Sequence, residues 1–356
     1  MSDSLRPTGP VPGPASEATP GIGSGPPDTV RAFVVTGGDA VTTGVRSLEL
    51  DALGPGDVVV RVEWSAINYK DAMVTRPGNR VARISPLVPG VDLVGTVVAS
   101  DDGSIAVGQE VIVHGYDLGV AHHGGFAQAA RVPAGWVVPL PPGLTGRRAA
   151  VIGTAGFTAA LSLDRLERHG LTPADGEVLV TGASGGVGSM AVALLAARGY
   201  QVVASSGKTS ERDYLVGLGA AEVIGRDDLH TAAERTLGPE RWSGAVDCVG
   251  GTTLAAVLRT LRYGAAVAAS GLTGGNTFES SVYPFIVRGA SLLGIDTVQT
   301  PIEERRRVWD VLATAYPSDL LDRMVDDQIG LESLAPALDR ILAGGTRGRI
   351  LVDPGS

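Results

Sequence analysis

From about residue 30 to residue 150, the chain alternates short apolar runs with turns rich in glycine and proline. Runs of this length and composition predict β-strands. Because one such run follows another with no long helical period between them, we expect a partly closed antiparallel β unit. The expected strands are 31–36, 57–64, 91–99, 110–115 and 126–132.

The pattern changes near residue 149. A helix is expected over 148–168, with Gly153 and Gly156 as weak points inside it. Beyond it, strands that are apolar throughout alternate with helices, which is typical of a parallel sheet buried on both faces. Six strands in this spacing match a doubly wound, Rossmann-type α/β fold. These strands are 177–181, 201–205, 221–224, 244–249, 264–270 and 291–295, with helices at 187–198 and 210–218.

The two ends of the chain differ from these regions. Residues 1–29 hold seven prolines and five glycines and too few large aliphatic residues to bury a core, so we expect a disordered tail. After the sheet, two helices and a strand are too short to stand alone and are expected to pack back onto the β unit. The predicted organisation is therefore a tail at 1–29, a β unit at 30–150, a dinucleotide-binding domain at 151–297 and a C-terminal return at 298–356.

Composition and charge narrow the class of protein. Apolar residues make up 44% of the chain, enough for sizeable cores, and the net charge of −9 argues against a nucleic-acid partner. No apolar run approaches the roughly 18 residues that span a bilayer. The single cysteine, Cys248, permits no internal disulfide and favours a reducing compartment. We therefore expect a cytoplasmic globular protein with neither a membrane nor a nucleic-acid partner.

The strongest local motif is Thr-Gly-Ala-Ser-Gly-Gly-Val-Gly at 181–188. It follows an apolar strand and opens a helix, which is the context of the dinucleotide-binding fingerprint. Glycine is needed there because a side chain would hold the pyrophosphate away from the backbone N–H groups at the start of the helix. The motif predicts a dinucleotide site; a purely structural glycine turn is the alternative.

The end of the second strand predicts which dinucleotide binds. An NAD enzyme typically places an acidic residue about 20 residues after the glycines. Here Lys208 occupies that position, within Ser-Ser-Gly-Lys-Thr-Ser at 205–210. Hydroxyl groups and an ammonium suit a 2′-phosphate, so the sequence predicts NADPH; a solvated turn is the alternative.

Metal chemistry finds little support in the sequence. Dehydrogenases with this order of domains often bind zinc through clustered Cys and His ligands. In this chain Cys248 lies in the Rossmann part, His122 and His123 are adjacent, and His114 and His230 are isolated. We predict no metal site, and we expect Cys248 to be a buried strand residue.

Five segments together carry a family resemblance. They are Asn68-Tyr69-Lys70-Asp71, Pro89-Gly90-Val91-Asp92, residues 152–159, the loop at 182–188 and Ser206-Gly207-Lys208. Over about 30–356, the chain resembles the zinc-free, quinone-oxidoreductase-like branch of the medium-chain dehydrogenase/reductase superfamily, and within it the NADPH-dependent acrylyl-CoA reductases. The resemblance implies a GroES-like β-barrel catalytic domain, a Rossmann NADP-binding domain, an active site in the cleft between them and a homodimer.

Position by position, the resemblance implies twelve cofactor contacts. They are Tyr69, Ser184, Gly185, Gly186, Val187, Ser206, Gly207, Lys208, Arg226, Leu272, Ile286 and Thr297. Near the C-terminus, Ala-Gly-Gly-Thr at 343–346 departs from the asparagine-rich turn that is frequent in the family, so one further contact stays unassigned.

The implied reaction is reduction of the carbon–carbon double bond of a short 2-enoyl-CoA, acryloyl-CoA to propanoyl-CoA. Hydride reaches the β-carbon, and the resulting enolate is stabilised and then protonated at the α-carbon. Tyr69 is the candidate for orienting the nicotinamide and polarising the carbonyl. Asp92 and Arg349 are further catalytic candidates lining the cleft, although they could simply pair with each other, and Lys70 and Asp71 could only brace the loop. The alternatives are the same chemistry on quinones or 2-alkenals, or an NADPH-binding protein without turnover.

Overall fold

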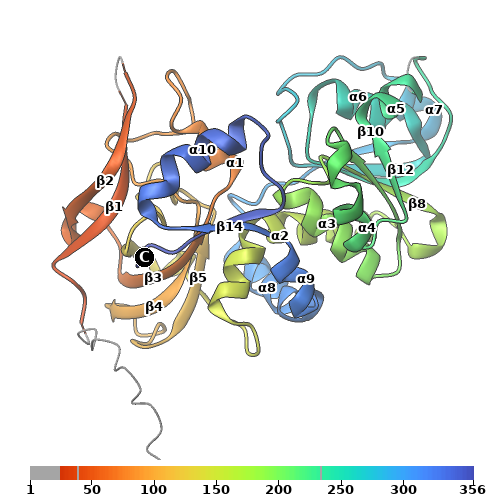
Figure 1. Cartoon of the computed structure of the whole chain (residues 1–356). Coiled ribbons are helices and arrows are strands. Elements are labelled where there is room, and N and C mark those ends of the chain that lie inside the picture. The colour runs from red at the N-terminus through yellow and green to blue at the C-terminus, as the bar shows by residue number, and fades with distance from the viewer. Residues whose placement is uncertain (1–24, 38–39, 233–234) are drawn as a thin grey trace, which may run out of the picture.

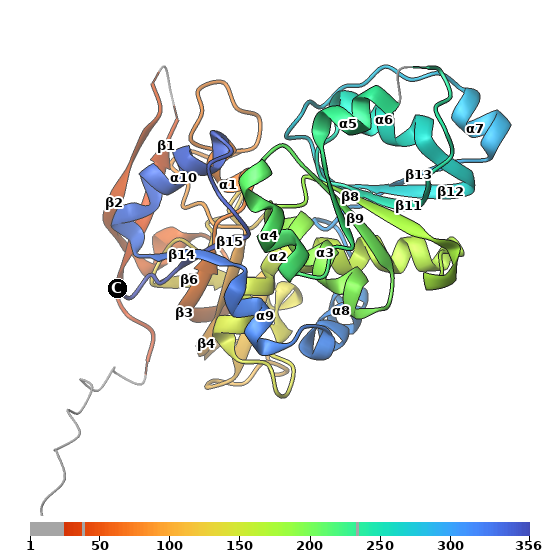
Figure 2. The ribbon, with the colours of Figure 1, turned by 45° about the vertical axis from the view of Figure 1, so that its right-hand side comes forward.

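Two β-sheets, one in each half of the molecule, organise the fold (Figures 1 and 2). The computed structural model describes residues 25–37, 40–232 and 235–356. Residues 1–24 of the predicted tail therefore lie outside the described residues. The first strand begins at Thr29, the last residue assigned to the tail, which pairs with Glu49.

The first half contains a seven-stranded sheet in the order β14-β15-β3-β4-β5-β7, with β6 pairing with β3. Its strands are β3 (Val58–Ala66), β4 (Asp92–Ser100), β5 (Glu110–His114), β6 (Ala129–Val132), β7 (Val138–Pro139), β14 (Val325–Ile329) and β15 (Arg349–Val352). Strand β15 pairs antiparallel with β3, so the end of the chain returns to the sheet formed by its first half.

A separate antiparallel hairpin, β1 (Thr29–Thr36) and β2 (Thr42–Glu49), packs beside this sheet. The side chains of β1 are largely buried, and its strand was predicted. Strand β2 was not predicted, because its residues are exposed or half-buried throughout and show no apolar alternation.

The second half is a six-stranded parallel sheet in the order β10-β9-β8-β11-β12-β13, which confirms the predicted Rossmann-type architecture. Strand order reverses between β8 and β11, and ligands of such sheets bind in the crevice beyond the carboxyl ends at this point. The strands are β8 (Glu177–Thr181), β9 (Gln201–Ser206), β10 (Glu222–Gly225), β11 (Trp242–Asp247), β12 (Leu261–Ala269) and β13 (Ser291–Gly294). The helices that connect them are α3 (Gly186–Ala197), α4 (Arg212–Gly217), α5 (Arg226–Ala232), α6 (Gly251–Thr260) and α7 (Tyr283–Arg288).

Helix α2 (Gly146–Arg168) joins the two halves, packing against β3 and β4 on one side and against α3 and β12 on the other. It runs across the predicted domain boundary at residue 150. Helices α8 (Ile302–Ala315) and α9 (Ser318–Arg323) pack on α2, whereas α1 (Tyr69–Met73) packs on α10 (Leu334–Leu342). No helix in the described ranges is long and apolar enough to cross a membrane.

A kink interrupts α2 at Gly153, one of the two weak points predicted in this helix. Gly153 has φ 47° and ψ −156°, a conformation that L side chains rarely adopt. A Cβ atom at this position would lie 2.6 Å from Oδ2 of Asp92. The kink therefore brings the backbone of α2 against the start of β4.

Candidate functional site

The loop between β8 and α3 leaves no room for side chains on its inner face. Gly182 has φ 59°, and a Cβ atom on Gly188 would lie 2.3 Å from the carbonyl oxygen of Gly182. Helix α3 begins here, so its first backbone N–H groups face the carboxyl edge of the sheet. This cradle fits the pyrophosphate of a dinucleotide. The structure places four predicted cofactor contacts in it: Ser184, Gly185, Gly186 and Val187.

Hydroxyl groups and two cations gather where β9 and its neighbour β10 end. The Oγ atoms of Ser184 and Ser206 lie 3.1 Å apart, and Ser206 Oγ also accepts a hydrogen bond of 3.1 Å from the backbone N–H of Lys208. Arg226, at the end of β10, lies over Gly207, where a Cβ atom would be 2.8 Å from its Nη2. Within the described ranges, neither Lys208 nor Arg226 pairs with a carboxylate. Both charges are therefore available to an anion such as a 2′-phosphate.

The turn before β15, residues 343–348, contacts the segment around Lys208. A cavity of about 260 Å³ lies between Lys208 and the turn, lined by Lys208, Glu211, Asp326, Gly345, Thr346 and Arg347. Nζ of Lys208 donates to the carbonyl oxygen of Thr346, and the N–H of Gly348 donates to the carbonyl of Ser184 over 2.9 Å. The turn that departs from the family pattern thus borders the predicted phosphate site.

Near the glycine loop, at the start of β4 and of β15, Asp92 and Arg349 form a buried ion pair. Nη2 of Arg349 lies 3.2 Å from Oδ2 of Asp92, and the two residues are 3% and 2% exposed respectively. Asn68 bridges them, donating to Asp92 over 2.7 Å and accepting from Arg349 over 3.1 Å. Thr154, just after the kink in α2, donates to Oδ1 of Asp92 through its N–H and its hydroxyl. With four donors, the Asp92 carboxylate holds other groups in place.

Arg349 connects the two halves of the site. Its Nη1 would lie 3.2 Å from a Cβ atom at Gly186 in the glycine loop, and it donates to the carbonyl oxygen of Ile67 over the same distance. Nε of Arg349 donates to the carbonyl of Val151 in α2. Burial lowers the pKa of this guanidinium, and the charge of Asp92 opposes that shift.

The motif Asn-Tyr-Lys-Asp forms the first turns of α1. Tyr69 is half-buried, and within the described part of the chain its hydroxyl makes no hydrogen bond, so it is free to contact a ligand. Asp71 is fully buried and accepts backbone N–H bonds from Asn68, Gly90 and Val91 over 2.8, 3.2 and 2.9 Å. Asp71 therefore links the start of α1 to the loop that precedes β4, in agreement with the interpretation that it braces this part of the chain. Burial raises the pKa of Asp71 to about 7, with the nearby charge of Asp92 adding to the effect.

Of the three remaining predicted cofactor contacts, only two lie at the carboxyl edge of the parallel sheet. Leu272 follows the carboxyl end of β12, and Thr297 follows that of β13. Ile286 lies on α7, which precedes the amino end of β13 and sits at the outer end of this half (Figures 1 and 2). Its side chain is 71% exposed there. The structure therefore does not bring Ile286 beside the glycine loop of its own chain.

The residues present do not fit a catalytic metal. The described ranges contain no group of three or more His, Cys, Asp and Glu side chains that could hold a metal ion. His122 is engaged with the carbonyl oxygens of Pro55 and His123. Cys248 lies one residue beyond β11 and is half-buried, rather than buried within the strand as expected. Desolvation of the thiol raises its pKa, and the charge of Asp247 adds to this effect.

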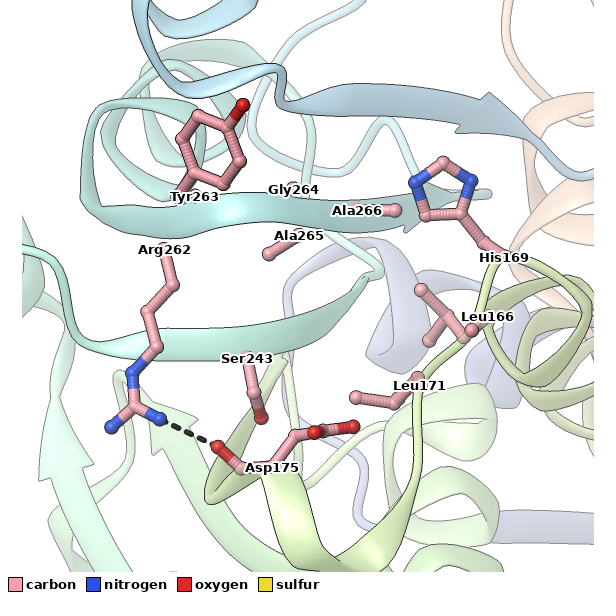
Figure 3. Close-up of a pocket in the computed structure, with 11 residues that line it drawn as sticks. Leu166, His169, Leu171, Asp175, Ser243, Arg262, Tyr263, Gly264, Ala265 and Ala266 are labelled. Atoms are coloured by element: carbon pink, nitrogen blue, oxygen red, sulfur yellow. Dashed lines mark hydrogen bonds between the residues drawn. The ribbon is translucent and has the colours of Figure 1, made fainter.

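A second cavity, of about 290 Å³, lies at the amino ends of β11 and β12 (Figure 3). His169, Ser243 and Tyr263 line it, and Nη1 of Arg262 donates to the carbonyl oxygen of Asp175 at its rim over 2.5 Å. Because cofactors of parallel sheets bind at the carboxyl ends, this cavity is not part of the candidate site.

Comparison with known proteins identifies the family. The alcohol dehydrogenase GroES-like domain matches residues 54–142, and the zinc-binding dehydrogenase family matches residues 186–314. The acrylyl-CoA reductase AcuI of Ruegeria pomeroyi is 47% identical over 309 residues, which cover 87% of this chain and 93% of AcuI. The chain belongs to the quinone-oxidoreductase-like branch of the medium-chain dehydrogenase/reductase superfamily. It is an oxidoreductase of that superfamily.

Two other relatives frame the site. YhfP of Bacillus subtilis, which is named as a quinone oxidoreductase, is 47% identical to this chain. The match covers 88% of this chain and 95% of the YhfP chain. Its crystal structure with NAD bound has a TM-score of 0.88, covering 91% of this chain and 99% of YhfP at 46% identity. The YhdH oxidoreductase of Salmonella enterica in complex with NADP has a TM-score of 0.87, with 44% identity and coverage of 91% and 99%. The GroES-like and Rossmann assignment of the fold is thereby confirmed.

Sequence reasoning missed two site residues and left the role of a third open. Thr154 follows Gly153, whose weakness in the helix was noted, but nothing local indicates that it bonds Asp92. Asn68 was part of the motif without a role. Arg305, in α8, is fully buried, with its Nη1 2.9 Å from Nδ1 of His114. No sequence signal separates it from its arginine neighbours, so only tertiary packing reveals it.

Proposed function

We propose that this protein uses NADPH to reduce the double bond of a short 2-enoyl-CoA, converting acryloyl-CoA to propanoyl-CoA. The observation that carries the proposal is that two cations beside Ser206, Lys208 and Arg226, pair with no carboxylate of the described residues, in a chain 47% identical to an acrylyl-CoA reductase. NADPH, when bound, supplies the hydride.

The choice of NADPH rests on the end of β9. An acidic side chain there would repel a 2′-phosphate and accept the ribose hydroxyls of NAD, whereas an ammonium and a guanidinium attract the phosphate. YhdH of Salmonella enterica was crystallised with NADP and YhfP with NAD. Relatives of equal similarity thus carry either cofactor, and the local charge of this chain favours NADPH.

On the substrate side, we assign Tyr69 the role of hydrogen-bond donor to the thioester oxygen. Its hydroxyl makes no hydrogen bond to another described residue, and it begins the helix that Asn68 and Asp71 brace. A donor aimed at an oxygen that gains negative charge lowers the barrier to reaction. The ion pair of Asp92 and Arg349 holds Asn68, and so fixes where α1 starts.

Isotope labelling tests the reaction directly. With acryloyl-CoA and NADPH deuterated at the transferable C4 position, we expect propanoyl-CoA with deuterium at C3 and a solvent proton at C2, and one NADP⁺ for each product. Mass spectrometry and NMR locate the label. NADPH oxidation without deuterium in the acyl group contradicts the proposal.

A second candidate function is quinone reduction. It is favoured by the 47% identity to YhfP and by the same hydride chemistry at the cofactor. It does not require a binding surface for coenzyme A, so the two candidates differ in their acceptor and share the cofactor site.

We also propose that two copies of this chain form a dimer through β13. This strand ends the parallel sheet, and its outer edge pairs with no described strand. Exposed apolar side chains flank the edge: Val282, Tyr283, Ile286, Val287 and Leu292. A second copy pairing with the edge would cover them. Sedimentation equilibrium of the wild type and of Leu292→Lys tests this, because only the wild type should be dimeric.

A further inference from the structure

Arg305 is a fully buried arginine that lies outside the glycine loop and the ion pair of Asp92 and Arg349. It lies on α8, with 0% of its surface exposed. Its guanidinium sits between the turn that follows β5, residues 114–116, and the segment that follows β13, residues 296–300. Burying such a charge is costly unless several groups accept its hydrogen bonds, so its surroundings indicate what it is for.

One side of the guanidinium holds the segment after β13. Nη2 of Arg305 donates to the carbonyl oxygens of Thr297, Val298 and Thr300, over 3.1, 3.4 and 3.4 Å. This segment lies at the carboxyl edge of the parallel sheet, where the cofactor is expected. Arg305 therefore fixes the backbone that carries Thr297, a predicted cofactor contact.

The other side faces the catalytic domain. Nη1 of Arg305 lies 2.9 Å from Nδ1 of His114, whose Nε2 accepts a 2.8 Å bond from the indole of Trp309. The guanidinium also lies 4.6 Å from the centre of the Tyr116 ring. Burial and the charge of Arg305 lower the pKa of His114 well below its usual range, so the imidazole is neutral beside the arginine.

The backbone around this contact is held in rare conformations. Gly115 has φ 77°, and a Cβ atom there would lie 2.8 Å from both Nη2 of Arg305 and the carbonyl oxygen of Thr297. Tyr116 has φ 50°, and its N–H donates to Val298 over 2.8 Å. Glycine adopts a positive φ freely, but Tyr116 carries a side chain, so its φ is strained. Such strain persists only where the surrounding structure enforces it, and it is most common at functional sites.

The contact continues to the Asp92 network. Thr154 Oγ1 lies 3.4 Å from Nδ1 of His114 and donates to Oδ1 of Asp92 over 2.6 Å. A continuous set of buried polar groups thus runs from the segment of Thr297, through Arg305, to the carboxylate that positions Asn68. It joins the cofactor edge of one domain to the substrate side of the other.

We propose that Arg305 is a positioning residue for hydride transfer, which sets the placement of the segment 296–300 relative to the catalytic domain. The inference rests on the proposed function only in that a hydride leaves the cofactor in this cleft. It does not depend on which acceptor takes the hydride. Small errors in the placement of reacting groups cost rate far more than they cost affinity.

Arg288 provides a matched control. It is also buried, at 8% exposure, and donates to three backbone carbonyl oxygens, those of Gly238, Arg259 and Leu261. These carbonyls lie near the amino ends of β11 and β12, away from the cofactor edge. Arg288→Lys therefore reports the loss of stability from weakening a buried arginine without disturbing the cleft.

The test compares Arg305→Lys with Arg288→Lys in the full-length enzyme. Each variant is measured for melting temperature, NADPH dissociation constant, kcat and the emission spectrum of bound NADPH. We expect both to lose stability, but only Arg305→Lys to lower kcat, by about ten- to a hundredfold, with the NADPH dissociation constant within about threefold of wild type. Its bound NADPH should emit at a wavelength shifted toward that of free NADPH.

A kcat and an emission spectrum of Arg305→Lys that match those of Arg288→Lys would overturn the proposal and leave Arg305 a structural residue. If none of the tested acceptors supports NADPH oxidation by the wild type, the proposed function fails. The comparison of NADPH emission spectra still decides the role of Arg305 in that case. If Arg305→Lys does not fold, Tyr116→Phe serves instead, because it removes the hydroxyl that bonds the carbonyl of Thr300 over 3.3 Å and also interacts with Arg305. For Tyr116→Phe we expect a smaller loss of kcat and a smaller shift in the emission of bound NADPH. A kcat and an emission spectrum equal to those of the wild type would overturn the proposal.

Discussion

At the scale of single residues, Lys208 carries the proposed choice of NADPH over NADH. Its ammonium lies where an acidic residue would select NAD, and it now donates to the carbonyl of Thr346. Lys208→Ala removes a charge-assisted bond to the 2′-phosphate, worth roughly 1.5–3 kcal/mol, or about ten- to a hundredfold in affinity. Fluorescence titration should show this loss for NADPH and almost none for NADH, the internal control. Equal weakening of both cofactors would show that Lys208 does not contact the phosphate.

The proposed role of Tyr69 as hydrogen-bond donor to the substrate can be tested by removing its hydroxyl. Tyr69→Phe keeps the ring and removes the hydroxyl. If that hydroxyl donates to the developing enolate, kcat should fall about a hundredfold, as when an oxyanion donor is removed. Tyr263→Phe, at a tyrosine 79% exposed on β12, is the control and should keep wild-type kinetics. Unchanged kcat and unchanged NADPH affinity in Tyr69→Phe would reduce Tyr69 to a structural role.

The buried carboxyl of Asp71 predicts a pH dependence of stability. Its pKa is raised to about 7 in the folded protein, so between about pH 4 and pH 7 the folded state holds a proton that the unfolded state releases. The contribution of Asp71 to the free energy of unfolding is therefore largest at low pH and falls as pH rises through this window. Asp71→Asn does not titrate.

Urea unfolding of the wild type and Asp71→Asn at about pH 5 and about pH 8 measures this effect. The stability of the wild type relative to the variant should decrease toward the higher pH. Because both proteins keep His114, whose titration acts in the opposite direction, the difference isolates Asp71. Curves that stay parallel across the range would mean that Asp71 is ionised in the folded protein throughout.

At the scale of elements, the kink in α2 positions the donors to Asp92. Gly153→Ala places a methyl group 2.6 Å from Oδ2 of Asp92 and adds the strain of a backbone conformation that is essentially restricted to glycine, about 1–3 kcal/mol by itself. Gly170→Ala, just past the end of the same helix, shares the positive φ but has no atom within 4 Å. We expect Gly153→Ala to lose more free energy of unfolding than Gly170→Ala and to lower kcat, since Asp92 must move. Equal losses with unchanged kcat would contradict this role.

Elements whose burial is visible in their own residues were predictable. The four inner strands of the parallel sheet, β8, β9, β11 and β12, are largely apolar because helices cover both faces there, and the glycine loop is a local motif. Strand β2 was missed because its side chains are exposed, and β14 because its residues are half-buried and include two aspartates. Helices α1 and α9 are too short to show a helical period.

The same distinction applies to the site. Lys208 and the glycines lie within one βαβ unit, so spacing along the chain indicates their shared role. Asp92 and Arg349 are 257 residues apart, and their pairing was one of two interpretations that the sequence left open. Arg305 and His114 are 191 residues apart, and no local pattern joins them.

For the whole molecule, the site exists only where the two domains meet. Gly348 bonds Ser184, Arg349 contacts the glycine loop, and Arg305 ties the segment after β13 to the turn after β5. The candidate cofactor cradle therefore comes from one domain and the Asp92 network from the other. Under the proposed function the two domains would bring NADPH and its acceptor together, and the identity of that acceptor is the central question.

One kinetic comparison addresses that question most directly. The rate of NADPH absorbance loss is measured side by side with acryloyl-CoA, a quinone and a free 2-alkenal, each over a range of concentrations that yields kcat/KM. We expect kcat/KM for acryloyl-CoA to exceed the other two values by at least about a hundredfold, because transition-state contacts to the thioester and coenzyme A are lost with the smaller acceptors. A value for the quinone that equals or exceeds that for acryloyl-CoA would contradict the assignment of this enzyme as an enoyl-CoA reductase.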